Sequence, residues 1–352
     1  MKKLKSETVR WINSRRPILG ALLLLAVLAG GAAARWQFFQ PAVKASGAPT
    51  PGVRVSYDYA VTQPIPQSID LDAARVALGG KLFHDPRLSA DDTVSCASCH
   101  NLAGGGVDNR SRSIGMRGAV GGINAPTVFN SGLNFVQFWD GRALTLEAQI
   151  DGPVTHPLEM ASSWQQVIGK LVQDPVYVQE FSKLYRDGLT APNIKNALAE
   201  FERSLLTPNS RFDKFLRGDS NALVEQEKKG YALFQSYGCS SCHQGVNLGG
   251  NMYEKMGLMG DYFADRGNPT EADKGRFNVT GNPDNLHEFR VPSLRNVALT
   301  APYFHDGSAR TLEDAIAVMV KYQLGRPMPD ADLQSIAAFL RTLTGQYQGK
   351  PL

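Results

Sequence analysis

Apolar residues recur at helical spacing in three stretches of the chain, while strand-like alternation is weak throughout. Asp70 is positioned to cap a helix that runs to about Phe83, and a second helix starts at Asn193 and continues to about Leu205. Asp330 is positioned to cap a third helix near the end of the chain. The pattern predicts a mainly α fold with long loops.

The first forty residues differ from the rest of the chain. Six basic residues fall within positions 1–16, and an apolar run extends from Pro17 to Ala34. Small residues at 32–34 would serve as a signal-peptide cleavage site, whereas the aromatic residues at 36–39 suit the far interface of a membrane anchor. Both interpretations stay open: residues 1–40 form a cleaved signal, or residues 17–39 are retained as an anchor. The proline-rich stretch 41–66 is a predicted flexible linker.

The chain repeats itself. A Gly-x-x-Leu-Phe sequence begins at Gly79 and again at Gly230. Farther on, thirteen residues from Phe138 match thirteen from Phe304, with eight identical positions at an offset of 166. A polar break follows Arg217. We therefore predict two duplicated domains, residues 67–215 and 216–352.

Each predicted domain contains one Cys-x-x-Cys-His sequence, and the two copies use all four cysteines. This is the attachment sequence of haem c, because two thiols one helical turn apart can bond the two vinyl groups of a porphyrin. The adjacent histidine then lies under the iron. Zinc sites and redox dithiols also use such cysteine pairs. Two copies, each with its histidine, favour two covalently bound haem c groups, held by Cys96, Cys99 and His100 and by Cys239, Cys242 and His243.

The two predicted haem sites differ on the second face of the iron. In the second repeat the helix after Thr311 carries Met319, whose thioether can be the sixth iron ligand. The residue at the equivalent position of the first repeat is Pro153, which cannot bind iron. A core methionine is the alternative for Met319, and Met252, Met256 and Met259 are weaker candidate ligands. The duplication therefore predicts a six-coordinate electron-transfer haem 2 and an open haem 1.

Two polar residues lie near Pro153. Glu159 could take a proton from one oxygen of a bound peroxide and return it to the other, and Gln149 could orient the peroxide by hydrogen bonding. From these residues alone, an ordinary surface glutamate is the default interpretation of Glu159.

These features together resemble the bacterial di-haem cytochrome c peroxidases, from about Leu78 to Gly345. The matching segments are Leu82–Ser89, Cys96–His100, Asn124–Thr127, Phe138–Gly141, Gln149–Met160, Phe201–Leu205, Cys239–His243, Phe289–Asn296 and Pro302–Gly307. The resemblance implies that each predicted domain is cytochrome c-like and that Gln149 and Glu159 are the distal catalytic pair.

The resemblance also implies roles that the residues alone do not give. Trp139 would carry electrons between the haems, and Met319 would bind haem 2. One calcium ion would be bound by the side chain of Asn124, the carbonyls of Thr300 and Pro302, and water, an oxygen-only ligand set that suits calcium.

The chain departs from the family at one position. Many members have a histidine about sixteen residues after the first haem sequence that blocks haem 1 until haem 2 is reduced. Met116 stands there, and no histidine occurs between His100 and His156. Either Met116 blocks the site, or haem 1 is open in both redox states, which we favour. Arg290 and Arg295 are either partners of haem propionates or ordinary surface arginines, and His305, the repeat equivalent of Trp139, is expected to face the region between the haems.

Composition adds two constraints. The formal charge of +4 arises from the basic N-terminus, so nothing favours nucleic acid as a partner. The resemblance to c-type cytochromes implies that the folded part lies in the periplasm, either soluble after signal cleavage or anchored to the inner membrane.

The favoured function is a cytochrome c peroxidase that reduces hydrogen peroxide with electrons entering through haem 2. The donor would be a small cytochrome c, a cupredoxin or, for an anchored protein, the quinol pool; a homodimer is a further candidate assembly. A MauG-type oxidase acting on a partner protein is a second hypothesis, although that relative carries a tyrosine where Met319 stands. A non-enzymatic electron-transfer cytochrome is the third, and it requires six ligands on both irons.

Overall fold

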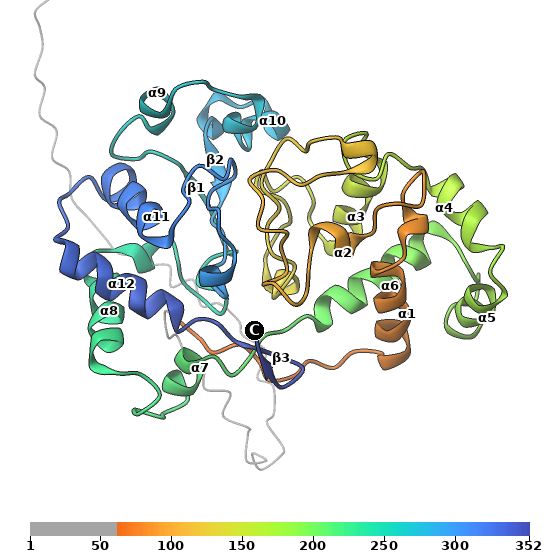
Figure 1. Ribbon diagram of the computed structural model, residues 1–352, viewed down its shortest axis with the longest axis horizontal. Coiled ribbons are helices and arrows are strands. Elements are labelled where there is room, and N and C mark those ends of the chain that lie inside the picture. Colours follow the sequence, from red (N-terminus) through yellow and green to blue (C-terminus); the bar gives the residue numbers. More distant parts are fainter. Residues whose placement is uncertain (1–61) are drawn as a thin grey trace, which may run out of the picture. The chain divides into compact units, whose positions relative to one another are not determined.

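The computed structural model describes residues 62–352, so the predicted signal or anchor and most of the predicted linker lie outside the described residues. Helices predominate in 62–352, and the strands are short (Figure 1). The prediction of a mainly α fold is confirmed. No helix within the described part is both long and apolar enough to cross a membrane.

The helices and strands have the following bounds. The helices are α1 (Ala73–Phe83), α2 (Cys96–Cys99), α3 (Leu146–Thr155), α4 (Trp164–Leu171), α5 (Pro175–Leu184), α6 (Ala191–Ser204), α7 (Arg211–Leu216), α8 (Glu225–Ser236), α9 (Tyr262–Arg266), α10 (Phe277–Thr280), α11 (Leu312–Met319) and α12 (Asp330–Arg341). Strand β1 (Tyr253–Lys255) pairs antiparallel with β2 (Glu288–Arg290), and β3 (Gln346–Tyr347) pairs antiparallel with β4 (Lys350–Pro351).

Three predicted helix starts were wrong by one or two residues. Helix α1 is capped by Asp72 and not by Asp70. The Asp72 side chain accepts hydrogen bonds from the backbone N–H groups of Ala74 and Arg75. Helix α6 begins at Ala191 after the cap Thr190, because a proline in its first turn needs no N–H partner there. Asp330 is the first residue of α12 and not its cap. The predicted end of the first helix at Phe83 is confirmed.

Two helix crossings of the same kind build the fold. Helix α1 crosses α6 at Gly79, where an added Cβ would lie 1.9 Å from the carbonyl oxygen of Ala197. Helix α8 crosses α12 at Gly230, where an added Cβ would lie 1.9 Å from the carbonyl oxygen of Ser335. A side chain at either glycine would force the helices apart, which explains the glycine that the sequence repeats before each cysteine pair.

The buried apolar side chains form two main clusters. The first contains residues between Leu78 and Leu205, and the second contains residues between Phe212 and Leu343. The C-terminal hairpin reaches back to the first cluster, where the ring of Tyr347 lies 5.1 Å from that of Phe129. Each cluster surrounds one of the helix crossings.

The backbone repeats at the offset of 166 that the sequence indicated. Phe138 and Phe304 have positive φ angles of 69° and 70°, and Asn130 and Asn296 both have 59°. Helices α3 and α11 are capped in the same way by threonine hydroxyls. These conformations are uncommon for non-glycine residues, so their recurrence places Pro153 and Met319 at equivalent positions of equivalent helices.

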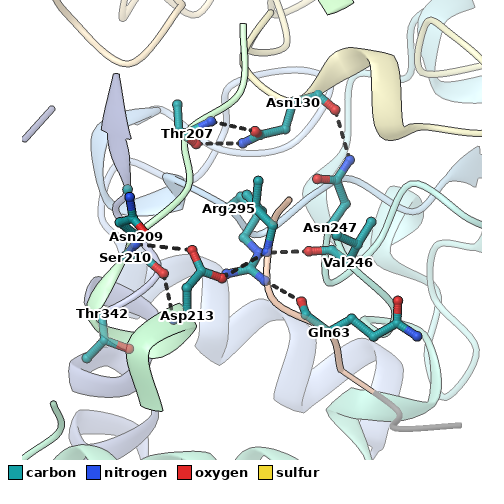
Figure 2. A network of polar contacts seen from close by, with 12 residues as sticks. Gln63, Asn130, Thr207, Asn209, Ser210, Asp213, Val246, Asn247, Arg295 and Thr342 are labelled. Atoms are coloured by element: carbon teal, nitrogen blue, oxygen red, sulfur yellow. Dashed lines mark hydrogen bonds and ion pairs between the residues drawn. The ribbon is translucent and has the colours of Figure 1, made fainter. Parts of the chain in front are cut away.

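A buried polar network connects the two halves of the described chain (Figure 2). The hydroxyl of Thr207 accepts hydrogen bonds from the side-chain amides of Asn130, at 2.7 Å, and Asn296, at 2.9 Å. Nearby, Arg295 donates to Asp213 at 2.9 Å, and both side chains are fully buried. The same guanidinium donates to the carbonyls of Gln63, at 2.7 Å, and Val246, at 2.8 Å.

Candidate active site

The first Cys-x-x-Cys-His sequence forms the short helix α2. Ser95 N donates to Ser98 Oγ at 3.0 Å, and the N–H of His100 donates to the carbonyl of Cys96 at 3.0 Å. One helical turn therefore separates Cys96 from Cys99 and places both thiols on one side, as thioether bonds to one porphyrin require.

The two histidines of these sequences, His100 and His243, make the same contact with a backbone carbonyl. Nδ1 of His100 lies 3.2 Å from the carbonyl of Gly106, and Nδ1 of His243 lies 3.1 Å from the carbonyl of Leu248. Desolvation lowers the pKa of each imidazole. Each ring is thus neutral and donates through Nδ1, which leaves the lone pair of Nε2 for a metal.

The cysteines are unlike those of a redox dithiol. Desolvation raises the pKa of the Cys96 thiol to about 12 and that of Cys239 to about 11. Reactive dithiols need a lowered pKa. The raised pKa of both thiols therefore argues against the dithiol interpretation.

A cavity of about 580 Å³ lies over the second sequence. Cys239, Cys242 and His243 line it on one side, and Met319 from the end of α11 lines it as well. Ile336 and Leu340 supply apolar wall from α12. The predicted ligands of haem 2 therefore share one largely apolar cavity, of the size that binds a cofactor.

The wall of this cavity contains a buried cation, the guanidinium of Arg290, without a counter-ion in the described part of the chain. Arg290 is 3% exposed, and its Nη1 has no hydrogen-bond partner among the described residues, although Nε donates to the carbonyl of Phe138 at 3.1 Å. Desolvation lowers the pKa of this guanidinium to about 10. A buried cation of this kind requires an anion, which a haem propionate would supply.

Arg295 has a different role from Arg290. The salt bridge with Asp213 and two carbonyl contacts already occupy its guanidinium. Neither arginine is an ordinary surface residue, since both are buried.

Helix α3 carries the residues expected above haem 1. Gln149 precedes Pro153 by about one turn, and both are partly buried. The ring of Phe138 packs against the same turn, since a Cβ at Gly152 would lie 2.7 Å from its Cζ. The guanidinium of Arg142 covers that ring at 3.4 Å from its centroid. The ring of Phe138 thus lies against the turn of α3 that connects Gln149 and Pro153.

A compact loop places Glu159 beside this helix end. Met160 N donates to the carbonyl of Pro153 at 3.1 Å, and Ser162 N donates to the carbonyl of Val154 at 2.8 Å, which fixes the loop against α3. The Glu159 side chain is 43% exposed, so a small solute can reach it. Desolvation raises its pKa, with His156 and Arg142 acting in the opposite direction.

Glu159 also lies within electrostatic range of the first haem sequence. Desolvation raises the pKa of the Cys99 thiol, and the charge of Glu159 adds to this effect. The carboxylate, the end of α3 and the Cys96–His100 sequence therefore belong to one site.

Met116 lies on the neighbouring loop. Its N–H donates to the carbonyl of Glu159 at 2.8 Å, and Gly115 packs so closely that a Cβ would lie 2.0 Å from the carbonyl oxygen of Leu158. The Met116 side chain is 9% exposed and belongs to the first apolar cluster. The main chain at Met116 thus supports the loop that carries Glu159.

The rings of Trp139 and His305 meet edge to face, with centroids 6.3 Å apart, and both residues line the cavity. The indole Nε1–H donates to the carbonyl of Asn124 at 2.9 Å. His305 Nε2 lies 2.7 Å from a carboxylate oxygen of Asp273. Burial opposes ionisation of Asp273, but hydrogen bonds from Arg266 and His305 hold its pKa well below the usual range.

Asp273 and Arg266 were not found from the sequence. They lie in an insertion of the second half that has no counterpart in the repeated segments, so nothing marked them.

The residues implied for calcium lie together on the cavity wall. Asn124, Thr300 and Pro302 all line it. The side chain of Asn109 donates to the carbonyls of Leu299 and Ala301, at 2.8 and 3.0 Å. The backbone carbonyls of Thr300 and Pro302, which alternate with these two along the chain, accept no hydrogen bond from the described residues. They remain available to a cation, and Asn109 was missed because the sequence gives no sign of this contact.

Comparisons with known proteins agree on one family. Residues 73–221 match the sequence profile described as di-haem cytochrome c peroxidase. Cytochrome c peroxidase Ccp of Escherichia coli is 54% identical over 286 residues, which cover 81% of this chain and 61% of that protein. Cytochrome c551 peroxidase of Nitrosomonas europaea is 47% identical over 284 residues, which cover 80% of this chain and 84% of that protein.

More distant matches include MauG-type proteins. Methylamine utilization protein MauG of Methylorubrum extorquens is 32% identical over 296 residues, which cover 80% of this chain and 82% of that protein. The crystal structure of a MauG-like protein associated with microbial copper homeostasis superposes with a TM-score of 0.71 at 30% identity, covering 82% of this chain and 94% of that chain.

The chain belongs to the di-haem cytochrome c peroxidase family. It is a peroxidase oxidoreductase, as the resemblance implied. The chain spans 61% of the length of the Escherichia coli relative, so functions of that protein's remaining part are not carried over.

Proposed function

We propose that this protein reduces hydrogen peroxide to two water molecules with two electrons and two protons, at the site formed by Cys96–His100, α3 and Glu159. The observation that carries the proposal is the difference between equivalent helix positions: Met319 faces the second haem sequence, whereas Pro153 stands in its place in the first half. One half can complete an iron coordination shell, and the other leaves a face for substrate. Peroxide-dependent oxidation of a reduced small cytochrome c by the holoprotein tests the function.

Glu159 moves the proton in this proposal. Its raised pKa brings the carboxyl closer to neutral pH, where a group can both accept and return a proton efficiently. Gln149, one turn before Pro153 on α3, orients the peroxide through its amide. A haem held by Cys96, Cys99 and His100 would supply the redox-active iron and the electrons for reducing the O–O bond.

Electrons enter at the site of His243 and Met319. Trp139 precedes α3 in the chain, lines that cavity and contacts the ring of His305, which makes it the candidate conduit. The donor is a small cytochrome c, a cupredoxin or the quinol pool. We further propose one calcium ion at Asn124, Thr300 and Pro302, supported by the unpaired carbonyls, and a periplasmic location with or without an anchor at residues 17–39.

The MauG-type activity is the weaker alternative. Its relative is 32% identical, against 54% and 47% for proteins named as peroxidases. Met319 on the cavity wall also favours an electron-transfer haem over the tyrosine-ligated site implied for that activity. An electron-transfer cytochrome without catalysis would need a sixth ligand near Pro153.

Replacing Met319 with histidine should lower the potential of the haem at Cys239 and Cys242, because imidazole stabilises ferric iron more than a thioether does. A sulfur-to-iron charge-transfer band in the near-infrared spectrum of the wild type should disappear. Met259→His is the control, since that side chain is 62% exposed. A band that survives in Met319→His would assign the ligand to another methionine.

The fully oxidised protein should bind cyanide or peroxide without prior reduction. Thioether sulfur is a weak ligand of ferric iron, and the buried Met116 packs in the first apolar cluster. A high-spin ferric signal in the electronic spectrum checks the open site, and Met116→His should add a lag that pre-reduction removes. An oxidised wild type that is wholly low-spin and inert would contradict the open site.

A further inference from the structure

Glu202 on α6 is a buried acid that the proposed peroxide chemistry does not use. It is 7% exposed, and its carboxyl makes no hydrogen bond or salt bridge with any described residue. The neighbouring Arg203 is already paired with Glu147 at 2.6 Å and with Glu200 at 3.0 Å. A carboxylate in such a position is costly to ionise, so it needs an explanation.

The helix crossings locate Glu202 at the first haem site. Phe201 contacts Gly79 in one crossing as Phe339 contacts Gly230 in the other, so the next residues, Glu202 and Leu340, are equivalent. Leu340 lines the cavity over His243. By this correspondence Glu202 forms the same part of the wall around the first haem.

A second observation agrees with this placement. Desolvation raises the pKa of the Cys96 thiol, and the charge of Glu202 is the largest electrostatic addition. The carboxyl therefore acts on the sulfur that would be bonded to the porphyrin.

The surroundings of Glu202 favour its protonated form. Desolvation raises its pKa to about 8, Arg203 opposes this, and Glu147 on α3 adds to it. On α1 the residues at the crossing are uncharged, and the charged groups of that helix bond elsewhere, Arg75 to Asn196 and Lys81 to Glu180. The short η3 helix, Ser131–Leu133, has no titratable side chain.

We propose that Glu202 binds the proton that accompanies reduction of the haem attached at Cys96 and Cys99. One electron from the donor converts ferric to ferrous iron, and one proton from water joins the Glu202 carboxylate; oxidation releases both. The inference rests on haem attachment at Cys96–His100 and is independent of peroxide turnover.

The electrostatic reason is direct. A carboxylate stabilises ferric iron more than ferrous iron, so reduction raises the proton affinity of Glu202. Glu202 would have one pKa when the haem iron is ferric and a higher pKa when it is ferrous. In the pH range between these two pKa values, the reduction potential of haem 1 falls as the pH rises. The limiting dependence is a tenfold change in the reduction equilibrium per pH unit, about 59 mV for one electron.

The test is a spectroelectrochemical titration of the holoprotein across the neutral and alkaline range, with Glu202→Gln and Glu202→Leu. In the wild type, the potential of haem 1 should fall with pH in one interval. In both variants that dependence should vanish and the potential should rise, while haem 2 is unchanged. Leucine is the residue of the equivalent helix, so it suits the packing if glutamine does not.

Glu200→Gln is the matched control, because it removes a carboxyl of the same helix that is paired with Arg203. It should keep the pH dependence. Infrared difference spectra should show a protonated carboxyl gained on reduction of the wild type and absent from Glu202→Gln. A pH dependence that survives in Glu202→Gln, or a wild-type potential with none in this range, would overturn the proposal.

Discussion

Replacing Glu159 with glutamine should reduce peroxide turnover by about 10²–10⁴, the usual contribution of a positioned acid–base group. The amide keeps the size of the side chain and removes its ability to take a proton. Both haems should remain attached, as mass spectrometry would show. The measurement is the steady-state rate of peroxide-dependent oxidation of a reduced cytochrome c.

Asp151→Asn is a suitable control for Glu159→Gln. Asp151 lies on α3, pairs with Lys195 and is 47% exposed, close to the 43% of Glu159. Its variant should keep nearly the full rate. Turnover close to that of the wild type in Glu159→Gln would reject Glu159 as the proton carrier.

The pH dependence of kcat/KM in the wild type should also reveal the raised pKa of Glu159. The carboxylate is the base, so kcat/KM should fall as the pH decreases through this pKa. The acid limb should therefore lie above the range of an ordinary glutamate, and Glu159→Gln should lose it.

Replacing Asp213 with alanine should lower the free energy of unfolding by about 3–5 kcal/mol, because it leaves the guanidinium of Arg295 buried without its counter-charge. The pair is fully buried, with 2.9 Å between Arg295 Nη1 and Asp213 Oδ1. Denaturant unfolding of the holoprotein measures the effect. The double variant Asp213→Ala with Arg295→Met should recover part of the loss, since no uncompensated charge remains.

Asp219→Ala provides the comparison for Asp213→Ala. Asp219 is exposed, and its side chain accepts a hydrogen bond from the backbone of Asn221. Its variant should change the free energy of unfolding by no more than about 0.5 kcal/mol. Equal losses in the two variants would mean that the Asp213–Arg295 pair has no special role in stability.

The sequence predicted those parts of the fold that repeat. The glycine before each cysteine pair and the offset of 166 both recur in the backbone, because duplicated segments need the same close contacts. The helix starts were less accurate, since Asp70 and Asp72 are equally good caps in a sequence and tertiary packing selects one.

The candidate site was predictable where a residue type carries its own chemistry. Cys96–His100 and Met319 are of this kind, and the cavity brings Met319 to His243. The role of Asp273 depends on a contact with His305 from 32 positions away, and Asn109 acts through carbonyls of residues 299 and 301. Such long-range pairings leave no local pattern. The sequence assigned no role to Glu202 beyond its place in the segment Phe201–Leu205, because a glutamate does not itself indicate that it is buried.

The helix crossings at Gly79 and Gly230 also set an order of events during biosynthesis. As the chain emerges, α1 lacks its main packing partner until α6, beginning at Ala191, has followed it. Cys96 and Cys99 lie between these helices in the sequence, and the second cysteine pair lies likewise between α8 and α12. Under the proposed haem attachment, each cysteine pair would be made before its closing helix, so each haem could be bonded before the corresponding crossing forms.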